Sequence, residues 1–280
     1  MGDIGILILF YNKLLQTIEC INSFLPSGQR VYVLNNGSHP AQWKKLQTIF
    51  RDQPTISLLD AGKNLGVSGG RNYLINASTE EWLFAVDNDI TIRPVSGWVK
   101  MMGAFLLTEP RARIICPAIY NVHEQAWCNQ LRVNKRGNTV DIMSGHYAVT
   151  NCFPGGASIV HRSIFDQYGL WDDEMFVGFE DYEFALRAMV DGSEGLKAFS
   201  CISIELVHDH QFQRSLKDKE AVRQRYNEEK LKVSYERIVK KHAIVFEHEW
   251  QWWCRKQVSD MTKIKHIQLL KRRVRKLLGK

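Results

Sequence analysis

Short apolar runs rich in β-branched residues alternate with amphipathic stretches along the first 86 residues of the chain. The apolar runs predict strands at 4–10, 31–34, 56–59 and 82–86, and the amphipathic stretches predict helices at 14–24, 41–50 and 67–77. Strands separated by single helices are typical of right-handed βαβ units on a parallel sheet. We therefore expect an α/β protein with a mostly parallel sheet and helices flanking it.

Polar, turn-forming residues follow each of these four predicted strands. They form the segments Tyr11-Asn12, Asn35-Asn36-Gly37-Ser38, Gly62-Lys63-Asn64 and Asp87-Asn88-Asp89. Because ligands of open α/β sheets bind beyond the carboxyl ends of the strands, the four loops predict one shared site. Past about residue 110 the alternation weakens, and short strands at 132–135, 139–143 and 157–160 predict a second half that extends to about residue 210.

Two carboxylates, Asp87 and Asp89, alternate at the end of the predicted strand 82–86. Two oxygen ligands at this spacing can share one hard cation, and Mg²⁺ or Mn²⁺ is usually completed by phosphate oxygens of a substrate. A solvated Asp/Asn turn produces the same pattern, so this motif alone leaves both interpretations open.

The segment 64–72 joins a predicted strand to a helix and reads Asn-Leu-Gly-Val-Ser-Gly-Gly-Arg-Asn. Its glycines let the backbone approach a ligand closely, and Arg71 suits a phosphate. A helix with a glycine-rich first turn is the alternative. A dinucleotide-binding fold is disfavoured, because its G-x-G-x-x-G motif follows the first strand, where this chain has Phe10-Tyr11-Asn12-Lys13.

Two further segments carry candidate catalytic or ligand groups. Glu180 and Asp181 lie at the start of a predicted helix, where an aspartate can accept a proton from a hydroxyl or simply cap the helix. His208-Asp209-His210 follows the apolar run 201–207, and a neutral imidazole there can complete a metal shell or lie on the surface.

Charge divides the chain into two regions. Residues 1–210 hold 17 Lys and Arg against 22 Asp and Glu, whereas residues 211–280 hold 20 against 8. Apolar residues between Met261 and Leu278 recur at helical spacing among many cations, so we expect residues 211–280 to form a basic helical extension. Six singly spaced cysteines, and a first segment without the features of a signal peptide, favour a cytoplasmic protein.

Taken together and in this order, these segments resemble the family 2 nucleotide-sugar glycosyltransferases, which have the GT-A fold. The resemblance covers roughly residues 4–210 and is most specific at 64–72, at 87–89 and in the block from Gly155 to Asp181. It implies a Rossmann-like nucleotide-binding half at 1–110 and an acceptor-side half at 111–210. It also implies an inverting single displacement that transfers a sugar from a nucleoside diphosphate to an acceptor hydroxyl.

The resemblance implies a role for each candidate residue. Asp181 is expected to be the general base, and Asp87, Asp89 and either His208 or His210 are expected to bind Mn²⁺ or Mg²⁺. The residues expected to contact the donor are Tyr11, Asn36, Asn64, Gly66, Arg71, Asp87 and Asn88. Those expected at the sugar and the acceptor are Gly155, Gly156 and Glu180. The family commonly has an acidic residue where Asn35 stands, and this departure leaves thymidine and guanosine donors open. A UDP-sugar is the first expectation, because an amide oxygen can still accept the N–H of uracil.

The basic extension lies outside the resemblance. A cationic amphipathic helix with Trp250, Trp252 and Trp253 upstream suits an anionic bilayer, so residues 250–280 predict peripheral attachment to the inner face of the plasma membrane, where lipid-linked glycan acceptors are found. Packing on the catalytic domain, dimerisation and nucleic-acid binding are the alternatives, of which nucleic acid is not expected. For the whole chain, a sugar nucleotidyltransferase and a non-catalytic membrane- or nucleic-acid-binding module are the alternative functions.

Overall fold

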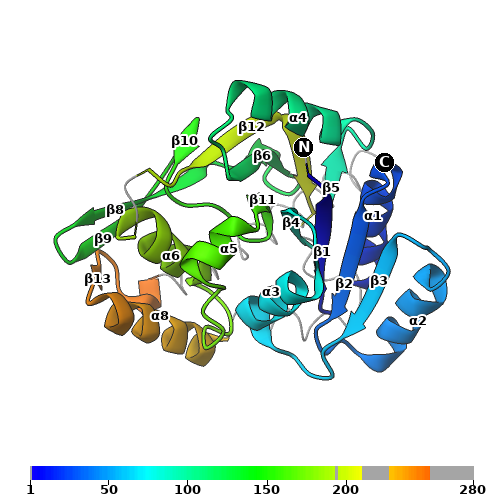
Figure 1. Cartoon of the computed structure of the whole chain (residues 1–280). Coiled ribbons are helices and arrows are strands. Elements are labelled where there is room, and N and C mark those ends of the chain that lie inside the picture. Colours follow the sequence, from blue (N-terminus) through cyan, green and yellow to red (C-terminus); the bar gives the residue numbers. More distant parts are fainter. Residues whose placement is uncertain (1, 193–194, 210–226, 253–280) are drawn as a thin grey trace, which may run out of the picture.

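The computed structural model of the chain describes residues 2–192, 195–209 and 227–252 (Figure 1). Its centre is one large sheet with the strand order β10-β12-β6-β11-β4-β1-β2-β3, and β5 and β7 pair with β12 and β6 off this path. A separate three-stranded sheet has the order β13-β9-β8. The sequence prediction of an α/β fold with flanking helices is confirmed.

The first half of the chain builds the parallel part of the large sheet. Its strands are β1 (Ile4–Phe10), β2 (Arg30–Asn35), β3 (Ile56–Asp60) and β4 (Trp82–Asp87). Its helices are α1 (Leu14–Phe24), α2 (Pro40–Phe50) and α3 (Gly66–Ala77), with a 3₁₀ turn at Leu25–Ser27. All neighbouring strands in the order β4-β1-β2-β3 pair in parallel, as the βαβ pattern predicted.

The chain from residue 90 onward makes the sheet mixed. Its strands in this sheet are β5 (Ile90–Arg93), β6 (Ile114–Asn121), β7 (Ala126–Trp127), β10 (Val149–Thr150), β11 (Ala157–His161) and β12 (Ala198–His208). Its helices are α4 (Trp98–Thr108), α5 (Ser163–Tyr168) and α6 (Glu180–Ala185), which continues into a π-helical turn at Leu186–Val190. Because β11 runs antiparallel between β4 and β6, the mostly parallel arrangement holds only for the first half.

Apolar side chains fill both faces of the large sheet. On β1, Ile4, Ile6, Ile8 and Phe10 join one buried cluster with residues of α1, α2 and α4, whereas Leu7 joins a second cluster with residues of α3, α5 and α6. This alternation follows from the period of two residues along a strand. The layers hold the carboxyl ends of the strands in fixed positions.

A third cluster joins the small sheet to a late helix. The small sheet consists of β8 (Gln130–Arg136), β9 (Thr139–Gly145) and β13 (Val245–Phe246), and the helix is α8 (Glu228–His242). Ile238 of α8 is fully buried against Val140 and Phe179 of the earlier half. Residues 228–246 therefore pack on the glycosyltransferase-like body, which was predicted to end at about residue 210. Figure 1 shows α8 beside α6.

The predicted basic helix between Met261 and Leu278 lies outside the described residues, as does Trp253. Among the residues that are described, no helix combines the length and the apolar character needed to cross a bilayer.

Candidate active site

The two halves of the chain meet at a cleft of about 1110 Å³ of empty space, part of it open to solvent. Its charged lining consists of Arg71, Asp87, Glu180, Asp181 and His208, which come from α3, β4, α6 and β12. Apolar side chains of β6 and β8 line it as well, among them Ile119 and Leu131. The cleft thus gathers residues from four of the predicted motifs, which lie up to 137 positions apart in the sequence.

Arg71 is the cation at the centre of this site. Its guanidinium nitrogens lie 3.6 Å from Asp87 Oδ1, 3.6 Å from Glu180 Oε1 and 3.4 Å from Asp181 Oδ1. Burial alone lowers the pKa of Arg71, but these three carboxylates outweigh it and raise that pKa, so the guanidinium stays charged. One carboxylate of β4 and two adjacent carboxylates of α6 therefore share one buried cation.

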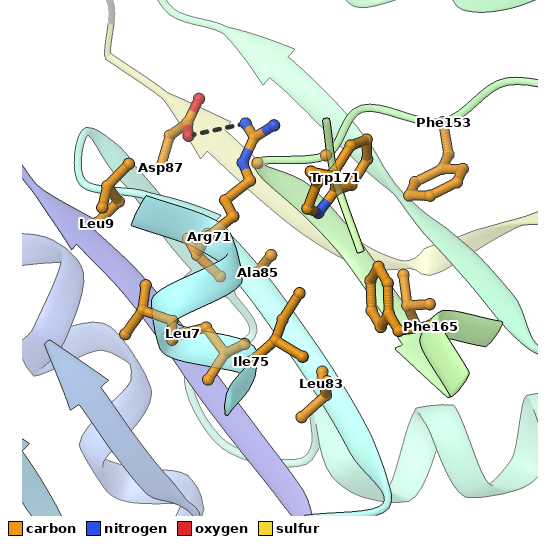
Figure 2. A pocket seen from close by; sticks show the side chains of 15 residues that line it. Leu7, Leu9, Arg71, Ile75, Leu83, Ala85, Asp87, Phe153, Phe165 and Trp171 are labelled. Carbon is orange, nitrogen blue, oxygen red and sulfur yellow. Dashed lines mark ion pairs between the residues drawn. The ribbon is translucent and has the colours of Figure 1, made fainter. Parts of the chain in front are cut away.

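An apolar pocket lies behind Arg71 and fixes the direction of its side chain. Leu7, Leu83, Ile75 and Phe165 line this pocket, and Figure 2 shows the Arg71 side chain pointing away from them toward Asp87. The ring of Trp171 lies 5.5 Å from the Arg71 guanidinium carbon, within the range of a cation–π contact. The aliphatic stem is thus buried while the charged end points at the carboxylates.

Two adjacent glycines allow this close approach. A Cβ atom on Gly155 would lie 2.5 Å from Arg71 Nη1 and 2.6 Å from Asp181 Oδ1, and one on Gly156 would overlap the Asp87 carboxylate. The Gly155 N–H also donates a hydrogen bond of 3.1 Å to Asp181 Oδ1. Gly155 and Gly156 therefore lie at the charged cluster, where the absence of a side chain makes room for it.

Asp181 has the properties of a general base. Burial raises the pKa of Asp181 to about 7, Arg71 and the Gly155 N–H oppose this shift, and the neighbouring Glu180 and Asp87 carboxylates add to it. Its side chain is 30% exposed, so a substrate hydroxyl can reach it. A carboxylate with this pKa is ionised at slightly alkaline pH and binds a proton well. Beside it, buried Glu180 has one oxygen, Oε2, without a hydrogen-bond partner among the described residues.

Asp89 lies in a second charged cluster, next to the first. Lys13 Nζ lies 2.7 Å from Asp89 Oδ2, and His208 Nε2 lies 3.2 Å from Asp89 Oδ1. Burial alone raises the pKa of Asp89, but Lys13 and His208 outweigh it and hold that pKa well below its ordinary value. Asp89 is therefore a permanent anion. His210 lies outside the described residues.

The donor atoms of the two clusters suit a divalent cation in their chemistry. Asp87 and His208 line the cleft, and Asp89 contacts His208, which makes two carboxylates and one imidazole available. Mn²⁺ accepts this set of ligands and Mg²⁺ favours its oxygens. In the part of the chain that is described, however, no three His, Cys, Asp or Glu side chains are grouped as a metal site. Because Lys13 holds Asp89, a cation bound there has to compete with Lys13.

Several residues predicted at the donor use their side chains inside the protein. Asn36 accepts a hydrogen bond from Leu65 N at 2.8 Å and donates one to Gly66 O at 2.9 Å, while Asn64 Oδ1 accepts the Gly66 N–H at 2.9 Å. Gly66 has φ +75°, and a Cβ there would meet the backbone of Phe176. These three residues shape the loop before α3, and their direct contact with a donor stays a prediction.

Two other predicted donor residues lie near the second cluster. Asn88 donates hydrogen bonds to Asn12 O at 3.0 Å and to Thr17 Oγ1 at 2.8 Å, so its side chain points toward α1. Tyr11 is half-buried in the loop after β1. The structure thus uses Asn88 to hold two loops together.

Sequence reasoning missed three residues of this region. Lys13 follows β1 in a left-handed conformation with φ 55°, Trp171 flanks Arg71, and Asp60 ends β3 beside Asn35. Asn35 Nδ2 donates a hydrogen bond to Asp60 Oδ1 at 3.0 Å. The Asp60 carboxylate therefore lies next to Asn35, the position where the family commonly has an acidic residue. The polar loop after β1 marks the region of Lys13 in the sequence, but no sequence motif indicates that Lys13 pairs with Asp89.

Comparisons with solved structures show the fold. The chain is similar to GalNAc-T7 with UDP, GalNAc and Mn²⁺ at a TM-score of 0.61 and 12% identity, covering 94% of this chain and 58% of that one. A mannosyltransferase from Pyrobaculum calidifontis with GDP-Man and Mn²⁺ gives 0.57 and 12%, covering 85% and 64%. S. aureus TarS with UDP-GlcNAc gives 0.54 and 14%, covering 85% and 66%. This similarity confirms the predicted GT-A fold.

Sequence comparison identifies the family. An uncharacterized protein of Haemophilus influenzae is 28% identical over 113 residues, which are 40% of this chain and 61% of that protein. The chain thus spans less than two thirds of that relative and of the first two structures. A family model described as glycosyl transferase family 2 matches residues 5–169, more than half of the chain. The chain therefore belongs to glycosyl transferase family 2.

Proposed function

We propose that this chain is an inverting glycosyltransferase that moves a sugar from a nucleoside-diphosphate sugar, a UDP-sugar by preference, to the hydroxyl of a glycan or a lipid-linked acceptor. The observation that carries the proposal is the contact between Asp181, a carboxyl group with its pKa raised to about 7, and the buried cation Arg71 in the cleft. A single displacement needs both groups, because a proton leaves the acceptor as negative charge develops on the diphosphate.

In the proposed reaction, the acceptor oxygen forms a bond to the anomeric carbon while the bond from that carbon to the diphosphate breaks. The acceptor proton passes to the Asp181 carboxylate, and the electron pair of the broken bond leaves with the diphosphate. Attack and departure occur on opposite faces of the sugar, so the anomeric configuration inverts. Arg71 is held by three carboxylates before any substrate binds, so its charge needs little reorganisation during the reaction.

Asp87, Asp89 and His208 would hold the divalent cation, Mn²⁺ or Mg²⁺, which as a Lewis acid stabilises charge on a diphosphate. The structures of GalNAc-T7 with UDP and Mn²⁺ and of the Pyrobaculum mannosyltransferase with GDP-Man and Mn²⁺ support this expectation for the present chain. Titration of the protein with Mn²⁺ and with Mg²⁺ identifies which of the two ions binds more tightly.

The preference for a uridine donor rests on the pair formed by Asn35 and Asp60. Their side chains are hydrogen-bonded at the neighbouring ends of β2 and β3, and the Gly62 N–H donates to the same Asp60 oxygen at 2.9 Å. The exposed carboxylate of Asp60 can accept the N–H of a uracil ring, as an acidic residue at position 35 would. Asp60 thus supplies the acid that the sequence lacks at Asn35.

The proposed location is the cytoplasmic face of a membrane, with lipid-linked acceptors presented to the cleft. Its support is the charge of residues 211–280, 20 cations against 8 anions, which favours an anionic bilayer surface. The segment that carries most of this charge lies outside the described residues, so binding to vesicles is the measurement that decides the point.

A thermal-shift screen tests the function. UDP, dTDP, GDP and CMP are each added with and without Mn²⁺, because a ligand that binds only the folded state raises the melting temperature. We expect a Mn²⁺-dependent rise with UDP that is lost in Asp60→Ala. A rise with another diphosphate reassigns the donor base, and the absence of a rise with all four nucleotides contradicts the transferase proposal.

A further inference from the structure

The segment from Asp172 to Phe179 connects the two sides of the cleft. At its start, Trp171 and Asn72 of α3 exchange hydrogen bonds of 2.8 and 3.0 Å. In its middle, Phe176 O accepts the Val67 N–H at 2.8 Å, at the beginning of α3. At its end it leads directly into Glu180 and Asp181. Its position therefore determines where the proposed base lies relative to Arg71 on α3.

Helix α8 holds this segment at several points. Arg237 Nε lies 2.8 Å from both carboxylate oxygens of Asp172, and Lys241 Nζ lies 2.7 Å from one of them. Ser234 Oγ donates to Val177 O at 3.0 Å, and Lys230 Nζ lies 3.5 Å from the ring centre of Phe176. The Asp172 side chain is only 2% exposed, so its charge depends on these partners.

The same helix is fastened to α6, which carries Asp181. Glu183 is fully buried, and its Oε1 lies 3.0 Å from Lys241 Nζ, 3.0 Å from Arg187 Nε and 3.3 Å from His242 Nε2. These contacts lie two residues beyond Asp181 along the chain. Both ends of the segment that presents the base are therefore tied to α8.

We propose that α8 is a positioning element of the active site, in which Arg237, acting through Asp172, sets the place of Asp181 beside Arg71. The inference rests on the proposed function, since it assigns a task only if Asp181 is the base. Helix α8 lies beyond residues 5–169, the part that the family model matches, as do Asp181 and His208. Arg237 touches no reacting group and acts only through the segment that it holds.

The expected size of the effect follows from the geometry of proton transfer. A base has to lie within hydrogen-bond reach of the hydroxyl, and a displacement of about 1 Å costs about 100-fold in rate. Nucleotide binding uses the other half of the cleft and should change little. This separates positioning from a general loss of structure, which would lower binding and turnover together.

The test uses the full chain as wild type, Arg237→Ala, Arg237→Lys and the control Lys240→Ala, which removes an exposed cation from the same helix. Calorimetry measures the affinity for UDP with Mn²⁺, and UDP release from UDP-glucose, UDP-galactose and UDP-GlcNAc in the absence of acceptor measures hydrolysis. We expect Arg237→Ala to lower the hydrolysis kcat about 100-fold with UDP affinity within twofold of wild type. Arg237→Lys recovers most of the rate, and Lys240→Ala matches wild type.

Amide hydrogen exchange gives a readout independent of activity. We expect faster exchange over residues 172–181 in Arg237→Ala and unchanged exchange over α3. Unchanged exchange at 172–181 overturns the inference, as does a wild-type rate in a variant with faster exchange. If Arg237→Ala does not fold, Ser234→Ala replaces it, because this variant removes only the hydrogen bond to Val177 O. We then expect the same changes in hydrolysis rate and in hydrogen exchange, each of smaller size. A wild-type protein that neither binds UDP nor hydrolyses these sugars instead contradicts the proposed function itself.

Discussion

Asp87 and Asp89 are two residues apart, yet they belong to clusters with opposite electrostatic character. The Asp87 side chain is 32% exposed in the cleft and shares Arg71 with two further carboxylates, so three anions compete for one cation. The Asp89 side chain is 2% exposed and lies between Lys13 and His208. In the first cluster burial and the neighbouring carboxylates raise the pKa of Asp181, whereas in the second Lys13 and His208 lower the pKa of Asp89 despite its burial.

This difference indicates a division of labour. The Arg71 cluster, made of Arg71, Asp87, Glu180 and Asp181, suits proton transfer, because one of its carboxyl groups titrates near neutral pH. The Lys13 cluster, made of Lys13, Asp89 and His208, holds a fixed anion that suits a cation. Variants of Asp181, Gly155 and Lys13 test whether the two clusters act separately.

The largest effect is expected from Asp181→Asn. An amide of the same shape cannot accept the acceptor proton, so transfer and hydrolysis should fall about 1000-fold, within the range for general bases. The affinity for UDP with Mn²⁺ should stay close to that of wild type, since the Lys13 cluster is intact. Rates and calorimetry on the same preparation check both points, and a rate near wild type would remove the base assignment.

The pH dependence of the rate should follow Asp181 alone. The base works in its ionised form, and its raised pKa of about 7 means that it becomes protonated as the pH falls below neutrality. We expect hydrolysis to fall about tenfold per pH unit below 7, which amounts to about 100-fold at pH 5. Asp89 does not titrate in this range, because its pKa lies well below the ordinary value. A flat profile between pH 5 and 8 would contradict the assignment.

Gly155→Ala should disturb the Arg71 cluster without removing any charged group. The added Cβ would lie within 2.6 Å of Arg71 Nη1 and Asp181 Oδ1, so the two groups must separate. We expect up to a 100-fold loss in kcat, the order of magnitude for a displaced base. Gly28→Ala serves as a comparison for lost stability, because Gly28 lies in a remote turn with φ +70°, which strains any side chain, although a Cβ there meets nothing within 4 Å. Its activity should stay at the wild-type level after correction for the folded fraction.

The smallest effect is expected at Lys13. Lys13→Met removes the ammonium group that holds Asp89 and leaves the carboxylate more available to a metal ion. Mn²⁺ should therefore bind about tenfold more tightly in the absence of nucleotide, which is the size of the pKa shift of about one unit that one neighbouring cation causes in a carboxyl group. Titration of Mn²⁺ followed by its paramagnetic resonance signal measures this. Weaker binding in the variant would mean that Lys13 supports the site and does not compete for it.

The sequence predicted the first half of the fold better than the second, for a physical reason. The strands β1 to β4 are continuous apolar runs separated by single helices, so their periodicity is local. β6 was missed, because Pro117 interrupts its pattern. Pro117 pairs with Cys201 of β12, next to a shift in register between Cys201 and Glu205. Because the hydrogen-bond ladder is interrupted at this shift, the backbone N–H that proline lacks costs little stability.

The candidate site shows the same division. Arg71, Asp87, Glu180 and Asp181 could be named from motifs in a fixed order, and the structure brings them into one cleft. The pairing of Lys13 with Asp89, 76 residues apart, has no signal in either loop. The ion pair of Arg237 with Asp172, 65 residues apart, depends on packing of α8 that composition does not reveal.

The late position of α8 in the chain has a consequence for biosynthesis. A ribosome releases the strands β1 to β4, which lie within the first 87 residues, long before it releases Arg237. The nucleotide half can therefore begin to fold while Asp172 still lacks its partner. If α8 positions the base as proposed, a nascent chain gains an ordered Asp181 only after residues 228–242 have been made.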